Sequence, residues 1–262
     1  MNRHPIACGV IVALAAFVVQ PALAQDAAAT IKAAQYALGM IRGPQRIDAI
    51  NTLEYWGTGK VSRLPGIVTY HASLGYRLSA MRVDITPSNA DGSNQNLREI
   101  QVVSGNFAWN GSVPGGGFTP GTTATPMPGA LKDRLLQLWS TPHGALKAAE
   151  QAGANAKVAQ EGGATVIAFP LSGPLAGVTM KVTLNAKNQV ARVETRGPGN
   201  TVTETTYSDY KDLGEIETDV LFPLRIVQKQ GGMPVFDLTI TRTDANNPYV
   251  VFPVPDTVER AH

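Results

Sequence analysis

The strongest constraint on the fold is a run of alternating segments between Thr165 and Arg242. In Gly177–Leu184, apolar residues at every second position alternate with Thr and Lys, and Met233–Arg242 shows the same pattern. This period of two is typical of half-buried strands. The corners between the segments contain Gly and Asn, which favour tight turns. The sequence therefore predicts an antiparallel meander with one apolar face, which another layer must cover.

The residues before this region predict further strands, with helices ahead of them. Thr30 is a candidate N-cap for a helix that ends at Gly43-Pro44, and a short second piece carries Ile47 and Ile50 on one side. We expect both to pack against the sheet as amphipathic helices. Strands are expected at Thr52–Ser62, Arg77–Ile85, Arg98–Val103 and Asn106–Asn110. Trp56 interrupts the first of them, either as a ring that covers a neighbouring residue or as a rim residue of a pocket.

The middle of the chain changes from strands to loop and helix. Ser112–Gly129 is rich in Gly and Pro and longer than ordinary connections, which indicates a mobile lid or a tolerated insertion. Ala130–Trp139 has helical periodicity, and Thr141 caps a second helix that starts at Pro142 and ends at Gly153. We expect this pair, over about residues 130–152, to form a helical lid on the open face of the sheet.

The first 24 residues have the features of a cleavable export signal. A basic start at Arg3 and an apolar stretch precede Pro21-Ala22-Leu23-Ala24, whose ending is typical of signal peptidase sites. The stretch is too short to favour a membrane span of about 20 residues. Cleavage after Ala24 leaves Gln25–His262 as a single domain in the periplasm, with no integral membrane span. The only cysteine, Cys8, lies in the signal, so the mature chain forms no disulfide.

Charge and motifs exclude several classes of function. The 22 Lys and Arg residues against 20 Asp and Glu give a net charge of +2, and loss of Arg3 leaves +1. This balance argues against a nucleic-acid partner and against attraction to anionic lipid. The glycine motifs that bind phosphates and dinucleotides are absent from the sequence, and we expect no cofactor.

Three segments resemble a known domain. Gln137–Ala149, Tyr207–Asp212 and Phe222–Thr241 are similar to the N-terminal leader domain that precedes the catalytic domain in some exported metallo-β-lactamase-fold hydrolases. The resemblance covers most of Ala27–Pro255. The general layout also resembles the periplasmic lipoprotein carriers (LolA/LolB-like), in which a curved antiparallel sheet wraps round an apolar cavity lidded by helices. The resemblance implies an α+β fold with a highly curved antiparallel β-sheet, a half-barrel covered by short helices.

The catalytic features of that hydrolase superfamily are missing from the sequence. The His-x-His-x-Asp-His ligand run does not occur, and the mature chain has only His71, His143 and His262 at unrelated positions. Di-zinc chemistry requires clustered imidazole and carboxylate ligands. The chain stops at His262, where the catalytic domain is expected to begin. We therefore expect no metal site and no hydrolase activity.

Two polar groups remain as candidates for catalysis. His143 lies near Ser140 at the start of a helix, but no nucleophile elbow surrounds it, and local hydrogen bonds explain it better. The richest polar cluster consists of Tyr207, Asp209, Tyr210 and Asp212. Strand alternation puts Tyr207 and Asp209 on one face and Tyr210 on the other. Cross-strand pairing with Arg192, Arg196 or Arg225 is a sufficient explanation of this cluster.

The apolar face is the best candidate for function. We expect its strand residues to line the concave side of the sheet and the helix residues to face them. The candidate ligand-binding residues are Met81, Val83, Phe107, Trp109, Leu135, Leu138, Trp139, Met180, Val182, Leu224, Phe236 and Leu238. Either the helices fill the concavity as a closed core, or they leave a cavity for an acyl chain, in which each buried methylene contributes about 0.8 kcal/mol. The sequence does not separate these alternatives, because both need the same residues.

Three functions follow in order of preference. The first is an exported, non-catalytic carrier for an apolar ligand, a lipid or a lipidated protein, with Ser112–Gly129 and the Pro142 kink giving access. The second is an accessory domain that docks onto a separately encoded metallo-β-lactamase-fold hydrolase. The third is a hydrolase that uses His143 or the Tyr207–Asp212 cluster.

Overall fold

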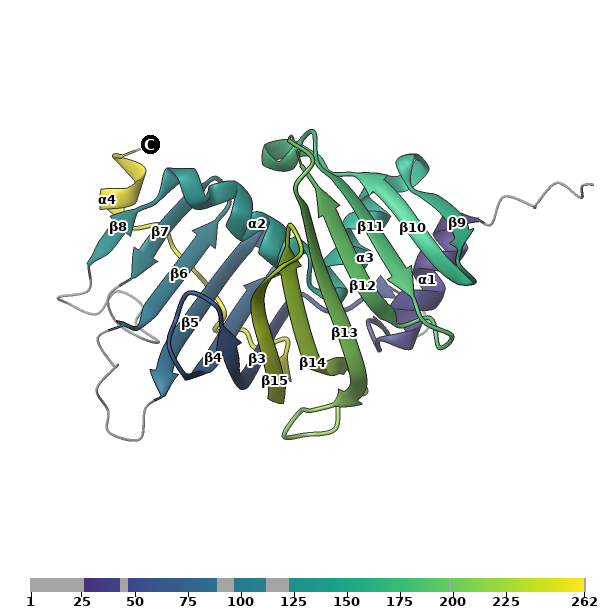
Figure 1. Ribbon diagram of the computed structural model, residues 1–262, viewed down its shortest axis with the longest axis horizontal. Helices are drawn as coiled ribbons and strands as arrows, with labels where there is room; N and C mark the ends of the chain where they lie inside the picture. The colour runs from purple at the N-terminus through teal and green to yellow at the C-terminus, as the bar shows by residue number, and fades with distance from the viewer. Residues whose placement is uncertain (1–25, 43–46, 89–96, 112–122, 198, 262) are drawn as a thin grey trace, which may run out of the picture.

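The computed structural model describes residues 26–42, 47–88, 97–111, 123–197 and 199–261 (Figure 1). The expected export signal and most of the Ser112–Gly129 segment lie outside these residues. The described chain forms a large antiparallel sheet, curved and unclosed, with a few short helices, as the sequence predicted. In this part of the chain, no helix is long and apolar enough to cross a membrane.

The sheet consists of two meanders that meet in its middle. The first contains β3 (Thr52–Val61), β4 (Ile67–Gly75), β5 (Ala80–Ser88), β6 (Glu99–Ser104), β7 (Phe107–Gly111) and β8 (Ala124–Pro126). The second contains β9 (Lys157–Glu161), β10 (Ala164–Pro170), β11 (Thr179–Leu184), β12 (Val190–Arg196), β13 (Val202–Asp212), β14 (Leu221–Gln230) and β15 (Met233–Ala245). β3 pairs antiparallel with β15 and joins the two. The edges of this 13-stranded sheet are therefore β8 and β9.

The N-terminal region differs in part from the prediction. α1 spans Ala27–Ala37, and its N-cap is Asp26, whose carboxylate accepts a hydrogen bond from the Ala28 amide at 3.0 Å. Thr30 lies inside the helix instead. The predicted second helical piece is wrong, because Ile47–Asp48 forms β2, which pairs antiparallel with β1 (Ile41–Arg42). A β-branched isoleucine in each short strand favours this extended conformation.

The connection between the two meanders explains why helices cover the sheet. β8 and β9 follow each other in sequence but lie at opposite edges, so the chain between them crosses one face of the sheet. The crossing contains η3 (Pro128–Ala130), α2 (Leu131–Trp139), α3 (Pro142–Ala152) and η4 (Gly153–Asn155). As predicted, Thr141 caps α3 by accepting a hydrogen bond from the Gly144 amide at 3.2 Å, and Gly153 ends it with a positive φ of 53°.

One apolar core joins the helices to both meanders. Leu138 of α2 and Leu146 of α3 are fully buried among residues such as Leu74 of the first meander and Met180 of the second. α1 packs beside α3, and the amide of Gln35 donates a hydrogen bond to the Glu150 carboxylate at 2.8 Å. The helices therefore fill the middle of the concave face, which is the closed-core alternative for that region.

The outer face carries a second, smaller apolar cluster. Trp109 packs there with Ile100, Val102 and Val258, and Phe107 lies against the same group. In Figure 1 the chain after β15 passes behind the first meander to α4 (Asp256–Glu259), beside β7 and β8. The expectation that Phe107 and Trp109 line the concavity is therefore wrong. The C-terminal residues cover them from the other side.

Candidate functional site

A pocket of about 400 Å³ lies where the helical layer meets one rim of the sheet. Three connections bring the rim together: the β4–β5 turn, which contains η1 (Tyr76–Leu78), the β6–β7 turn at Gly105, and the β10–β11 connection with η5 (Gly173–Leu175). Since the first two belong to one meander and the third to the other, the pocket spans both halves of the sheet. α2 and α3 complete its wall.

The helices give the pocket an apolar wall with room beside it. Leu135 and Trp139 are four residues apart on α2, and Ala148 and Ala152 are four apart on α3, so each pair shares one helix face. All four side chains line the pocket. The two alanines present only methyl groups there, and this small size leaves space next to the tryptophan.

Buried tyrosines fix the α2–α3 junction against the sheet. The Tyr76 hydroxyl lies 3.0 Å from the Thr141 hydroxyl, and the Tyr207 hydroxyl donates a hydrogen bond to the Ser140 carbonyl. The Gln137 amide donates to the Tyr70 hydroxyl at 2.7 Å. Burial raises the pKa of Tyr70 to about 12 and the pKa values of Tyr76 and Tyr207 further. The three hydroxyl contacts therefore hold the Pro142 kink against the sheet.

The structure distributes the twelve predicted ligand-binding residues over three environments. Eight are buried members of the main core, namely Met81, Val83, Leu135, Leu138, Trp139, Met180, Val182 and Leu238, and Phe236 packs against that core. Of these, Leu135 and Trp139 also line the pocket. Phe107 and Trp109 lie on the outer face, as described above. Leu224 is half-buried on β14.

A second hollow, of about 800 Å³, lies between α1 and the β13–β14 connection. Its lining includes the carboxylates of Asp212, Glu217 and Asp219 beside Lys211. Asp212 closes the loop by accepting hydrogen bonds from the amides of Gly214, Thr218 and Asp219. These bonds outweigh the effect of burial and lower the pKa of Asp212. The charged lining disfavours an apolar ligand in this hollow.

The Tyr207–Asp212 cluster does not come together. The pairing between β13 and β14 skips Asp209, which has a positive φ of 60°, although the register is the same on both sides of it. Tyr207 lies in the core and Tyr210 packs against it on either side of this left-handed residue, whereas strict alternation had placed them on opposite faces. Arg225 pairs with Asp237 at 2.8 Å rather than with this cluster. The predicted ion pairs of the cluster with Arg192, Arg196 or Arg225 do not form among the described residues, and Asp209 acts on Arg225 only as a nearby charge.

His143 is sealed in the interior. Its ring stacks on Phe222 with 5.9 Å between centroids, and in the described chain neither ring nitrogen has a hydrogen-bond partner. The expectation of local hydrogen bonds at the helix start is thus wrong. Burial, with the nearby charge of Lys147, lowers the pKa of His143 to about 3, so the imidazole is neutral at physiological pH.

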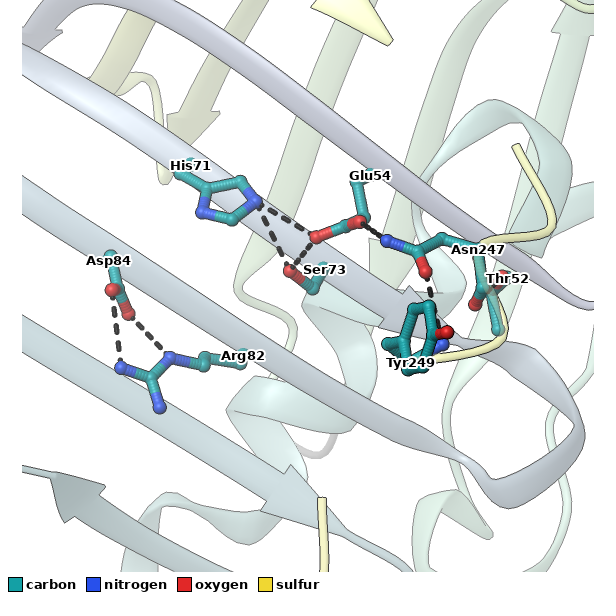
Figure 2. A network of polar contacts seen from close by, with 8 residues as sticks. All are labelled: Thr52, Glu54, His71, Ser73, Arg82, Asp84, Asn247 and Tyr249. Atoms are coloured by element: carbon teal, nitrogen blue, oxygen red, sulfur yellow. Dashed lines mark hydrogen bonds and ion pairs between the residues drawn. The ribbon is translucent and has the colours of Figure 1, made fainter. Parts of the chain in front are cut away.

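A polar network that the sequence did not reveal lies on the outer face of β3–β5 (Figure 2). Glu54 is buried and accepts hydrogen bonds from the Ser73 hydroxyl at 2.6 Å and the Asn247 amide at 2.6 Å, and His71 Nε2 lies 3.1 Å from the same carboxylate. Next to it, Arg82 pairs with Asp84 at 2.8 Å. The polar residues of these strands resemble an ordinary solvent face in sequence, which is why the network escaped prediction.

The geometry of this network is structural rather than that of a catalytic triad. Ser73 and Glu54 both approach the same His71 nitrogen, Nε2, whereas a triad uses the two ring nitrogens separately. Trp56 stacks on His71 with centroids 4.4 Å apart, and the Arg242 guanidinium lies 4.1 Å from the Trp56 ring centroid. Trp56 therefore covers neighbouring residues, the first of its two predicted roles. Among the described residues, no group of three or more metal-ligating side chains lies together.

Comparison with known proteins adds little to this geometry. No family model and no curated protein matches the chain. The chain is similar to a DUF1329 family protein from Desulfovibrio piger, at 7% identity over 84% of this chain and 93% of that one, with a TM-score of 0.44. It is also similar to an uncharacterized conserved protein from Thermus thermophilus, at 11% identity over 89% and 97% of the two chains, with a TM-score of 0.33. Neither score supports a functional argument, and the resemblance to a hydrolase leader domain has no support from family models or curated sequences.

Proposed function

We propose that this protein is an exported, non-catalytic binding module for an apolar ligand of the lipid class, held in the pocket between α2, α3 and the sheet rim. The observation that carries the proposal is the pocket itself, whose volume of about 400 Å³ includes walls from Leu135 and Trp139. Pockets for small ligands measure about 300–1,000 Å³ and are mostly apolar with a few polar groups. This pocket has a volume within that range, and its apolar wall from α2 and α3 faces polar residues such as Asn106, Gln151 and Asn155.

The proposal narrows the site expected from the sequence. Most of the predicted concavity is occupied by helix side chains, so the ligand enters at the rim and not beneath the lid. The export signal expected in the first 24 residues supports a periplasmic role, and an acyl chain is the part of the ligand that we propose to be buried. The chain then needs neither a cofactor nor a catalytic group.

Displacement of a fluorescent dye tests the proposal. The uncharged dye N-phenyl-1-naphthylamine is titrated into the mature protein, and a twelve-carbon alcohol or acid is then added below its micelle concentration. The expected result is dye binding with enhanced emission and competitive displacement at one site. Native mass spectrometry of protein prepared from its own periplasm supplies the independent readout, a co-purifying mass of the lipid class.

Two matched alanine substitutions connect the binding to this pocket. Ala152→Leu adds apolar volume inside the pocket, and Ala33→Leu adds the same volume at an exposed position of α1. The first is expected to weaken dye binding about tenfold or more, and the second to leave it unchanged. A flat titration with the wild-type protein, or equal binding by both variants, would show that the pocket is not the ligand site. An accessory domain for a hydrolase would give the flat titration.

A further inference from the structure

The pocket has one charged side chain at its mouth. Arg77 is the only ionisable residue among those that line it, and the remaining polar lining consists of hydroxyls and amides such as Ser79 and Gln151. Five other arginines, such as Arg63 and Arg82, form ion pairs with carboxylates. In the part of the chain that the structure describes, no carboxylate pairs with Arg77. The mouth therefore holds a guanidinium that is available to a ligand.

The backbone of Arg77 is held in place by its neighbours, and its side chain is exposed. It lies in η1 directly after Tyr76, whose buried hydroxyl contacts Thr141 at the α2–α3 junction. Ser79 ends the turn in the left-handed conformation with a φ of 50°. Leu78, between them, is 58% exposed and also lines the pocket. A cation and an apolar side chain thus stand together at the opening, above a wall of leucine, tryptophan and alanine.

From this juxtaposition we infer that the pocket binds a single-chain amphiphile with an anionic head group, with the chain against Leu135 and Trp139 and the head group on Arg77. The inference rests on the proposed function and names the ligand class for the same site. A guanidinium binds carboxylate or phosphate through paired hydrogen bonds, and both head groups fit this chemistry. The volume lies toward the lower end of the range for ligand pockets, which suits one chain rather than two.

Ligands with the same chain length and different head groups show how much the head group contributes to binding. Dodecanoate, dodecyl phosphate, dodecanol and dodecylamine each displace N-phenyl-1-naphthylamine at pH 7.5 and low ionic strength, below their micelle concentrations. The anions are expected to bind about 10- to 100-fold more tightly than dodecanol, which corresponds to one charge-assisted hydrogen-bonded contact. Dodecylamine is expected to bind most weakly. The tighter of the two anions identifies a carboxylate or a phosphate as the natural head group.

Substitution of Arg77 tests whether this residue causes the preference for anionic head groups. Arg77→Gln is expected to bring the Kd of the anions to within twofold of that of dodecanol while dodecanol binding stays constant, and Arg77→Lys is expected to retain part of the preference. Arg98→Gln, an exposed arginine at the opposite end of β6 from Gly105, is the matched control and is expected to retain all of it. Added salt is expected to weaken the anions alone, because the contact is close to solvent.

The outcomes distinguish this inference from the proposed function. If dodecanol binds as tightly as the anions, or if Arg77→Gln keeps the anion preference, the head-group inference is overturned and the apolar pocket remains. If none of the four compounds displaces dye from the wild-type protein, the proposed function itself fails. A preference for dodecylamine would also overturn the assignment of Arg77.

Discussion

The buried guanidinium of Arg134 offers the most direct test of how the helical layer is fixed. This residue of α2 is 5% exposed and donates hydrogen bonds to the carbonyls of Val102, at 2.8 Å, and Trp109, and to the Asn110 side chain. It therefore ties α2 to β6 and β7. Burial lowers the pKa of Arg134 to about 10, but it remains charged at neutral pH.

Arg134→Met keeps much of the side-chain stem and removes all the donors. Two backbone carbonyls, of Val102 and Trp109, then lose a partner, and each unsatisfied buried group costs about 1–3 kcal/mol. We expect the site to relax and admit some water, so the expected loss in the free energy of unfolding is about 3 kcal/mol, in the lower part of that range for two groups. With a urea m-value of about 3 kcal/mol/M, the midpoint moves by about 1 M.

Urea titration followed by tryptophan fluorescence measures the loss, because Trp139 lies on the same helix and Trp109 at the bonded strand. Arg98→Met, at an exposed arginine, is the control and is expected to change stability by less than about 0.5 kcal/mol. Equal midpoints for the two variants would refute the idea that Arg134 anchors α2. Dye binding is expected to weaken with Arg134→Met even where the protein is fully folded, since α2 forms a wall of the pocket.

Three further predictions concern the tyrosines, the outer face and the sheet centre. Tyr207→Phe removes the donor to the Ser140 carbonyl and is expected to lower the free energy of unfolding in urea by about 1–2 kcal/mol. Tyr249→Phe, at an exposed tyrosine, is the control and is expected to be neutral. Equal effects of the two substitutions would contradict the role of the Tyr207 hydroxyl. Burial raises the pKa of Glu54, but hydrogen bonds from His71, Ser73 and Asn247 outweigh burial and lower that pKa overall. The ionised carboxylate therefore stabilises the fold above the unfolded-state pKa of about 4.5, and this stabilisation is lost as the pH falls through the lower pKa of the folded state. The difference in melting temperature between wild type and Glu54→Gln is therefore expected to shrink as the pH falls below about 4.5, and a difference that is constant with pH would argue against the network. Gly59→Ala places a Cβ 2.0 Å from the Asp237 carbonyl oxygen and is expected to lower the melting temperature by several degrees. Gly197→Ala is the control, because nothing lies within 4 Å of the added Cβ there. A Gly59→Ala protein as stable as wild type would contradict the close approach of β3 and β15.

The sequence predicted strands such as β3 and β11 because alternation is a local property, but it did not predict β4, β8 or β9. It also located the crossing helices, since Thr141, Pro142 and Gly153 act on the backbone next to them. The face of the sheet on which each residue lies was harder to predict. The spacing of Phe107 and Trp109 shows that they share a face but not which face, and the register that pairs Trp109 with Val102, and Val102 with Arg82, depends on distant strands.

Some of the missed features had a signal in the sequence and others had none. The apolar residues Phe252, Val254 and Val258 near the C-terminus indicated that a second apolar surface needed cover, and they do cover Trp109. The left-handed backbone at Asp209 had no such signal, because any polar residue fits an exposed strand position. Likewise, Arg77 is one arginine among many in the sequence. Only the meeting of three separate connections shows that it stands at the mouth of a pocket.

The closed core and the open cavity, which the sequence posed as alternatives, coexist because of the connectivity of the sheet. A chain that must cross from β8 to β9 places α2 and α3 over the middle of the concave face, and leucines there complete the core. The strand connections at the rim extend beside the helices rather than under them. At that level α3 presents Ala148 and Ala152, so the space between helix and rim is not filled. The cavity is thus a consequence of small residues at the end of the crossing, where Ala148 and Ala152 line it.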